Sequence, residues 1–237
     1  MTDGGPVRIL SGGAVKAGLA RNAELFSAET GLPHRIEFAT GPVIKERVAS
    51  GNAGADLIVI PRREFDDLIA AGRVSPKGVA ILGFVTVGVT VRDDAREPDL
   101  SSVDAFVRSL LAADRVIYNT ASSGLYVAEV IDRLGLTEKI RGKLSILPTG
   151  KAAMEALAAD TSGNAIGFGH ATEIRLHDYL GTHLVGPLPG AIGRQTPYAA
   201  GLPVDAGRPE AARQLIDFMI SARGVRLFHE TGVLQAG

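Results

Sequence analysis

Four short stretches of the sequence combine glycine with hydroxyl side chains. They read Ser-Gly-Gly-Ala at 11–14, Ala-Thr-Gly-Pro at 39–42, Ala-Ser-Ser-Gly at 121–124 and Pro-Thr-Gly-Lys at 148–151. Each follows a short apolar run and precedes an amphipathic stretch, so each is expected to be a turn from a strand into a helix. Unpaired backbone N–H groups and the positive end of the helix dipole attract anions to such turns. The four turns therefore predict a binding site for a small anion.

Each turn alone has a simpler interpretation, because Ser, Thr and Gly are preferred at helix starts and in turns. Four turns of the same chemistry favour ligand binding, since glycine lets a ligand approach the backbone closely. Lys151 is either a solvated side chain or a cation that neutralises the anion. The candidate ligand-binding residues in these turns are Ser11, Gly12, Gly13, Thr40, Gly41, Ser122, Ser123, Gly124 and Lys151.

Further candidates lie outside the turns. His170 follows a predicted strand and titrates near neutral pH, so it is a candidate ligand contact and the candidate catalytic base if the protein is an isomerase. Its alternative role is to cap the next helix. Tyr198 either reaches the ligand or is a buried aromatic residue, and Glu173 is expected to stabilise the first turn of a helix. Arg47 and Arg194 could each clamp a carboxylate with two parallel hydrogen bonds.

These residues sit in a chain that alternates strands with helices, which predicts parallel sheets covered by helices. The first half is expected to hold strands at 7–10, 35–38 and 57–60 and helices at 14–30, 42–50 and 62–71. The second half repeats the order, with strands at 115–118, 144–147 and 165–168 and helices at 123–134, 151–158 and 172–180. Later segments predict strands at 182–185 and 195–202 and a helix at 209–221. Two α/β lobes follow from this repetition.

Composition excludes several classes of protein. The 237 residues carry 25 basic and 26 acidic side chains, a net charge of −1, so neither a nucleic acid nor a membrane surface is an expected partner. The apolar run at 79–91 is too short for a membrane helix and predicts a buried pair of strands. There is no cysteine, and the five histidines lack the spacing of a zinc site, so no metal is expected. No cofactor is expected either, because neither the phosphate-binding nor the dinucleotide-binding glycine motif is complete.

Five segments together resemble one protein family over nearly the whole chain. They are ILSGGAVKAGLARNAELFSAETG, IEFATGPVIKERVASGNAGADLIVI, ASSGLYVAEVIDRLG, AIGFGHATEI and EAARQLIDFMISARGVRLFHETGV. The sequence is similar to the molybdate-binding proteins, a family of transport solute receptors with the type 2 periplasmic-binding-protein fold, and it looks like a divergent branch of that family. The resemblance implies lobe one at 1–87 plus 193–237, lobe two at 88–192, each a mixed, mostly parallel sheet flanked by helices, and a ligand cleft between them.

In that family an oxyanion is held by hydroxyls and backbone N–H groups. By motif position the resemblance adds Ala153, early in its helix, and Phe168, where the family often has tyrosine. Thr40-Gly41-Pro42 stands where the family usually carries serine hydroxyls, and Phe168 lacks a phenolic O–H. An organic acid is therefore an alternative to molybdate.

The resemblance implies a receptor that closes by a hinge around a small oxyanion or carboxylate and delivers it to an ABC-type membrane permease. We expect a monomer, which is periplasmic if an export signal has been removed from this sequence and cytoplasmic otherwise. A relative of the same fold, aconitate isomerase, moves a double bond in a tricarboxylate, so the alternative function is an isomerase of an unsaturated polycarboxylate in the same cleft. A cytoplasmic ligand sensor is the third alternative.

Overall fold

The chain forms two compact units, each built around its own sheet. The computed structural model describes residues 5–235, and the units are residues 5–85 with 196–235 (unit 1) and Thr86–Gln195 (unit 2). The boundaries lie within strands β4 (Ala80–Arg92) and β9 (Gln195–Gly201).

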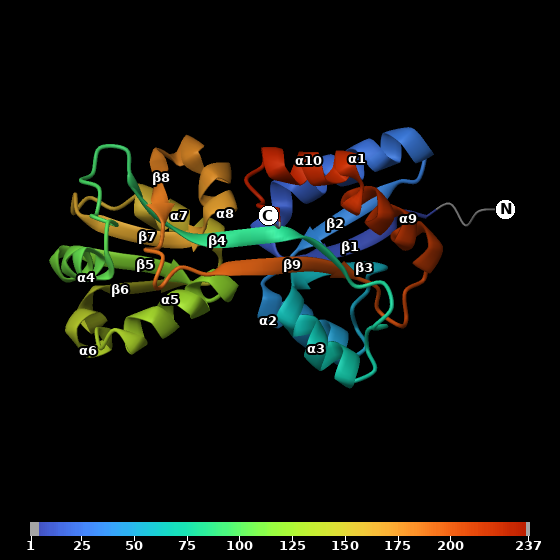
Figure 1. Cartoon of the computed structure of the whole chain (residues 1–237), viewed down its shortest axis with the longest axis horizontal. Coiled ribbons are helices and arrows are strands. Elements are labelled where there is room, and N and C mark those ends of the chain that lie inside the picture. The colour runs from blue at the N-terminus through green and yellow to red at the C-terminus, as the bar shows by residue number, and fades with distance from the viewer. Residues whose placement is uncertain (1–4, 236–237) are drawn as a thin grey trace. The chain divides into compact units, whose positions relative to one another are not determined.

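Unit 1 carries the strand order β2-β1-β3-β9, in which the first three strands are parallel and β9 is antiparallel to β3. Figure 1 shows α1, α9 and α10 on one face of this sheet and α2 and α3 on the other. The other elements of the unit are β1 (Val7–Ser11), α1 (Lys16–Thr30), β2 (His34–Phe38), α2 (Gly41–Ala49), β3 (Leu57–Pro61), α3 (Arg62–Ala70), α9 (Pro209–Ile220), α10 (Ala222–Glu230) and a 3-10 turn at Gly13–Val15.

Buried apolar side chains on both faces hold this sheet. Every residue of β3 is buried, as expected for a strand covered by helices on both sides. One face of α1 is buried as well, with Leu19 fully enclosed. Asp56 connects separate segments of unit 1. Its fully buried carboxylate accepts hydrogen bonds from the backbone N–H and guanidinium of Arg8 and from the N–H groups of Gly207 and Arg208. These bonds keep the pKa of Asp56 below its usual value despite its burial.

Unit 2 repeats the parallel arrangement in the order β6-β5-β7, with β4 antiparallel to β7 and β8 antiparallel to β4. In Figure 1, α4, α5 and α6 lie on one side of this sheet and α7 and α8 on the other. The elements are α4 (Val103–Ala112), β5 (Arg115–Asn119), α5 (Ser122–Arg133), α6 (Thr137–Ile140), β6 (Leu144–Leu147), α7 (Gly150–Ala158), β7 (Ala165–His170), α8 (Ala171–Leu176), β8 (Thr182–Pro187) and 3-10 turns at Arg141–Lys143 and Asp178–Leu180.

The structure corrects three expectations about elements. The apolar run at 79–91 forms one strand of 13 residues, β4, and not a pair, because its glycines do not form a turn. Helix α4 was not predicted, although Ser102 caps it by accepting from the N–H of Ala105 and Phe106 and Leu110 lie one turn apart in the core. His170 is the last residue of β7 and the N-cap position of α8, so the helix expected at 172–180 begins earlier and ends as a 3-10 turn.

Two kinds of feature are absent from residues 5–235. None of the helices there is long and apolar enough to cross a bilayer. The same part of the chain contains no group of three or more His, Asp or Glu side chains that could hold a metal ion.

Gly124 tests how tightly the turn after β5 is packed. A Cβ at this position would overlap the backbone carbonyl oxygen of Asn119, so Gly124→Ala is expected to lower the free energy of unfolding by about 3 kcal/mol. Gly142→Ala is the matched control, because a Cβ there would meet no atom within 4 Å. Urea denaturation of both variants measures the effect, and equal stabilities would contradict the packing described here.

Candidate functional site

The turn between β5 and α5 carries two hydroxyl groups with different partners. Asn119 accepts a hydrogen bond from the N–H of Ala121 at 2.8 Å, and its amide donates to the Ser123 hydroxyl at 3.3 Å. Ser123 is buried, so its hydroxyl belongs to the internal structure of the turn. The Ser122 hydroxyl lies instead 3.1 Å from Nε2 of His170. Gly124 allows the close approach of the Asn119 backbone that holds the turn in this shape.

His170 is almost completely buried, with 3 % of its surface exposed. Burial lowers the pKa of the imidazole to about 4, because the charged form loses its hydration. The positive charge of Arg194 lowers this pKa further, while a hydrogen bond with the backbone of Thr86 opposes both effects. His170 is therefore neutral at pH 7 and serves there as a hydrogen-bonding group without charge.

Arg194 is held beside this turn by an aromatic ring. Its guanidinium carbon lies 4.0 Å from the centre of the Tyr126 ring, a cation–π contact, and the Tyr126 hydroxyl donates to the carbonyl of Ile192 at 2.8 Å. Tyr126 comes from α5, so the helix that begins at Ser122 also positions the arginine. Among the described residues no carboxylate pairs with Arg194, and its half-buried charge is available to an anion.

The turn between β6 and α7 is occupied by the protein itself. Thr149 accepts a hydrogen bond from the N–H of Ala152 and so caps the helix. Ala153 is fully buried, and its N–H donates to the Thr149 carbonyl within the helix ladder. Lys151 is exposed and pairs with Glu155 one turn along the same helix. The side chain of Lys151 is therefore solvated here, and its contact with a ligand stays a prediction.

Phe168 lies in the core of unit 2. Its ring is fully buried and meets the ring of Phe106 edge to face, with the centres 6.0 Å apart. This packing accounts for a phenylalanine at the position, and the side chain presents no exposed surface to a ligand.

The first turn of unit 1 is compact. The buried hydroxyl of Ser11 donates to the carbonyl of Gly12, and the N–H of Gly12 donates to Val59 of the neighbouring strand β3. A Cβ at Gly12 would lie 3.4 Å from the ring of Tyr198, which is itself buried on β9. Gly13 opens the 3-10 turn that leads into α1.

The second turn of unit 1 has an open hydroxyl and a nearby carboxylate. Thr40 is the N-cap residue of α2, but its side chain makes no capping hydrogen bond. A Cβ at Gly41 would lie 3.0 and 3.1 Å from the two carboxylate oxygens of Glu64, so this side chain lies against the first turn of α2. Arg47, further along α2, pairs with Glu37 and donates to the carbonyl of Ala53, so these hydrogen bonds are made within unit 1.

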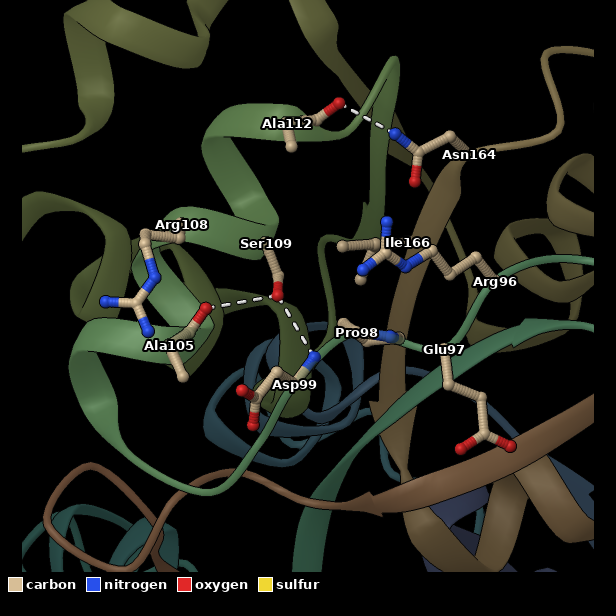
Figure 2. A pocket seen from close by; sticks show the side chains of 10 residues that line it. All are labelled: Arg96, Glu97, Pro98, Asp99, Ala105, Arg108, Ser109, Ala112, Asn164 and Ile166. Atoms are coloured by element: carbon tan, nitrogen blue, oxygen red, sulfur yellow. Dashed lines mark hydrogen bonds between the residues drawn. The ribbon is translucent and has the colours of Figure 1, made fainter.

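Unit 2 also contains a pocket of about 480 Å³ far from this chemistry. Figure 2 shows two of its polar side chains hydrogen-bonded: Asn164 donates to the carbonyl of Ala112, and Ser109 donates to the carbonyl of Ala105 and accepts from the N–H of Asp99. Asn164 directly precedes β7, whereas His170 ends it, so the pocket lies at the opposite end of the strand. Two arginines and two acids line the pocket, and its charge is balanced. Its lining residues are Arg96, Glu97, Pro98, Asp99, Ala105, Arg108, Ser109, Ala112, Asn164 and Ile166.

Sequence reasoning missed three residues of these turns. Asn119 is the last residue of β5, and its sequence signal is only its position three residues before the start of α5. Glu64 gives a stronger signal, because the same Thr-Gly turn followed by a glutamate 23 residues after the glycine recurs at Gly150 and Glu173. Lys16 lies over the ring of Phe38, at the end of β2, with its ammonium 5.0 Å from the ring centre.

The chain is similar to known proteins in sequence and in fold. A Pseudomonas protein named aconitate isomerase is 26% identical over 234 residues, which is 95% of this chain and 86% of that protein. The fold is similar to the periplasmic molybdate-binding protein of Azotobacter vinelandii, at a TM-score of 0.77, 16% identity and coverage of 98% of this chain and 100% of that one. It is also similar to the sulfate-binding protein of Mycobacterium tuberculosis, at a TM-score of 0.76, 16% identity and coverage of 96% and 86%.

These structural likenesses support the α/β architecture of periplasmic binding proteins, which the sequence predicted. The family model of the bacterial extracellular solute-binding proteins matches residues 7–234, nearly the whole sequence. The chain therefore belongs to the bacterial extracellular solute-binding protein family.

Proposed function

We propose that this chain captures a small organic anion and holds one of its carboxylates at the start of α5. The observation that carries the proposal is the group formed by Ser122, His170 and Arg194, all within unit 2. It combines a hydroxyl, a neutral imidazole and an arginine without a carboxylate partner beside the first turn of a helix. Fixed donors of this kind replace the hydration of an anion when it leaves water.

Arg194 favours a carboxylate over a compact tetrahedral oxyanion. A guanidinium binds a planar carboxylate through two parallel hydrogen bonds, and the cation–π contact of Arg194 with Tyr126 is not a hydrogen bond and uses none of its N–H groups. His170 is neutral at pH 7, so its imidazole can hydrogen-bond to a carboxylate at that pH without first losing or gaining a proton.

The first turn of unit 1 is proposed to supply donors to an anion, through the 3-10 turn at Gly13 and the ammonium of Lys16 at the carboxyl end of β1. The Thr40 hydroxyl, at the carboxyl end of β2, is proposed to meet an uncharged group of a ligand. Ligands of open parallel sheets bind at this end of the strands. In this proposal the protein delivers the bound anion to a membrane permease and works in the periplasm as a monomer.

A second candidate function is isomerisation of an unsaturated polycarboxylate. The relative named aconitate isomerase favours it, because the similarity extends over 95% of this chain. In such a reaction a base takes a proton from carbon, the double bond moves, and a proton returns to a different carbon, so no electron acceptor is needed. His170, bonded to Ser122, is the proposed base, and its pKa of about 4 leaves it unprotonated at pH 7.

Loss of Arg194 tests the proposed carboxylate site. Calorimetric titration with citrate, cis-aconitate, trans-aconitate, sulfate and molybdate is expected to show binding of a carboxylate, and Arg194→Gln is expected to weaken it about 10- to 100-fold through loss of a charged hydrogen bond. Arg108→Gln, at an exposed arginine elsewhere in unit 2, is the control that leaves affinity unchanged. Binding of sulfate or molybdate alone, with no effect of Arg194→Gln, would contradict the proposal.

The low pKa of His170 makes a prediction about stability. The unfolded chain protonates this histidine near its ordinary pKa of 6.5, whereas the folded chain resists protonation down to about 4. The folded state is thus penalised as the pH falls through this window, by up to about 3 kcal/mol, and the penalty is absent above pH 6.5. Urea denaturation from pH 7.5 to pH 4 should show this loss in the wild type and in the exposed-residue control His229→Gln, but not in His170→Gln. An equal pH dependence of the unfolding free energy in all three proteins would refute the predicted contribution of His170.

Proton NMR distinguishes an isomerase from a receptor. Incubation of trans-aconitate with the protein in D₂O is expected to produce the cis isomer with deuterium on carbon if the chain is an isomerase, and His170→Gln should lower the rate at least 100-fold, as expected for a lost general base. Unchanged substrate signals over a day at high protein concentration would reject this second function.

A further inference from the structure

The same arrangement of a glutamate and a glycine occurs in both units. In unit 1 the carboxylate of Glu64, in the first turn of α3, lies against Gly41, the first residue of α2. In unit 2 the carboxylate of Glu173, in the first turn of α8, lies so close to Gly150, the first residue of α7, that a Cβ there would overlap it. Glycine is required at the second position to make room for the carboxylate.

The chain repeats this arrangement with identical spacing. In each unit the glutamate lies 23 positions after the glycine, Glu64 after Gly41 and Glu173 after Gly150. Helix α2 begins and ends 109 residues before α7, and α3 begins 109 residues before α8. Each glycine also follows a threonine. Two independent positions of the fold therefore place a carboxylate at a helix start in the same way.

A carboxylate at a helix N-terminus uses the partial positive charge that an external anion would need. Glu64 is enclosed enough that one of its oxygens has no hydrogen-bond partner among residues 5–235, and burial raises its pKa. At α7 the Thr149 side chain caps the helix as well. A sulfate or molybdate brought to either turn would face a negative charge within a few ångströms, and such like-charge contacts are strongly unfavourable.

We infer that Glu64 and Glu173 are specificity-determining residues that close the first turns of α2 and α7 to the negative charge of a ligand. The helices that follow β1 and β5 have no acidic residue in their first turns, so these turns remain for carboxylates. A ligand group that meets a closed turn is an uncharged hydrogen-bond donor such as a hydroxyl. This inference rests on the proposed function and narrows its ligand to a small carboxylic acid, with hydroxyl substituents favoured, and away from tetrahedral dianions.

Isosteric removal of each charge tests the inference. Glu64→Gln and Glu173→Gln keep the size of the side chain, so each variant is expected to fold, and each site is an independent test. Both are expected to gain affinity for sulfate, about tenfold or more relative to the wild type, measured by calorimetry and by thermal shift at constant ionic strength. Glu210→Gln is the matched control, because Glu210 is an exposed first-turn glutamate of α9 that pairs with Arg213.

The comparison between variant and wild type decides the outcome. A sulfate affinity of both Gln variants equal to that of the wild type, whether measurable or absent in all, would overturn the inference. Failure of the proposed function would look different, since the wild type would then bind no carboxylate while the sulfate gain of the Gln variants could still occur.

Discussion

The first turn of a helix that follows a parallel strand carries N–H groups that the helix cannot pair, and both units are built around this constraint. The turns at the carboxyl ends of β1, β2, β5 and β6 satisfy it in different ways. Thr149 caps one helix directly, and the carboxylates of Glu64 and Glu173 compensate the dipoles of two. The start of α5 has no side-chain cap, and the group around Ser122 lies beside it.

The strand-to-helix turns therefore differ in electrostatic character, although the parallel strands before them are arranged alike in the two units. A glycine followed 23 residues later by glutamate makes a helix start that repels anions, whereas hydroxyls with Arg194 nearby make one that attracts them. The structural neighbours include proteins that bind molybdate and sulfate, but at 16% identity they bear on the fold alone. Charge placement at the turns, and not the fold, is what separates a carboxylate receptor from an oxyanion receptor in this account.

Much of the architecture could be predicted from the sequence because its signals are local. The strand at 144–147 and the buried face of α1 follow from periodicity within one element. The site was harder to predict because its chemistry depends on contacts between distant residues. Which of Ser122 and Ser123 faces His170 depends on where Asn119 points, and Arg194 is positioned by Tyr126, 68 residues earlier. Phe168 and Ala153 were expected near a ligand by family resemblance, but packing places both side chains in the core.

The most direct measurement follows the Cε1 proton of His170 by NMR while citrate, cis-aconitate or trans-aconitate is added at pH 7, with His170→Gln to assign the signal. If a carboxylate binds beside Ser122 and Arg194, the signal will shift saturably with one of them, and the pKa of the bound protein's His170 will rise above about 4, because a neighbouring anion favours the imidazolium. A signal that stays unchanged with all three acids would contradict the account.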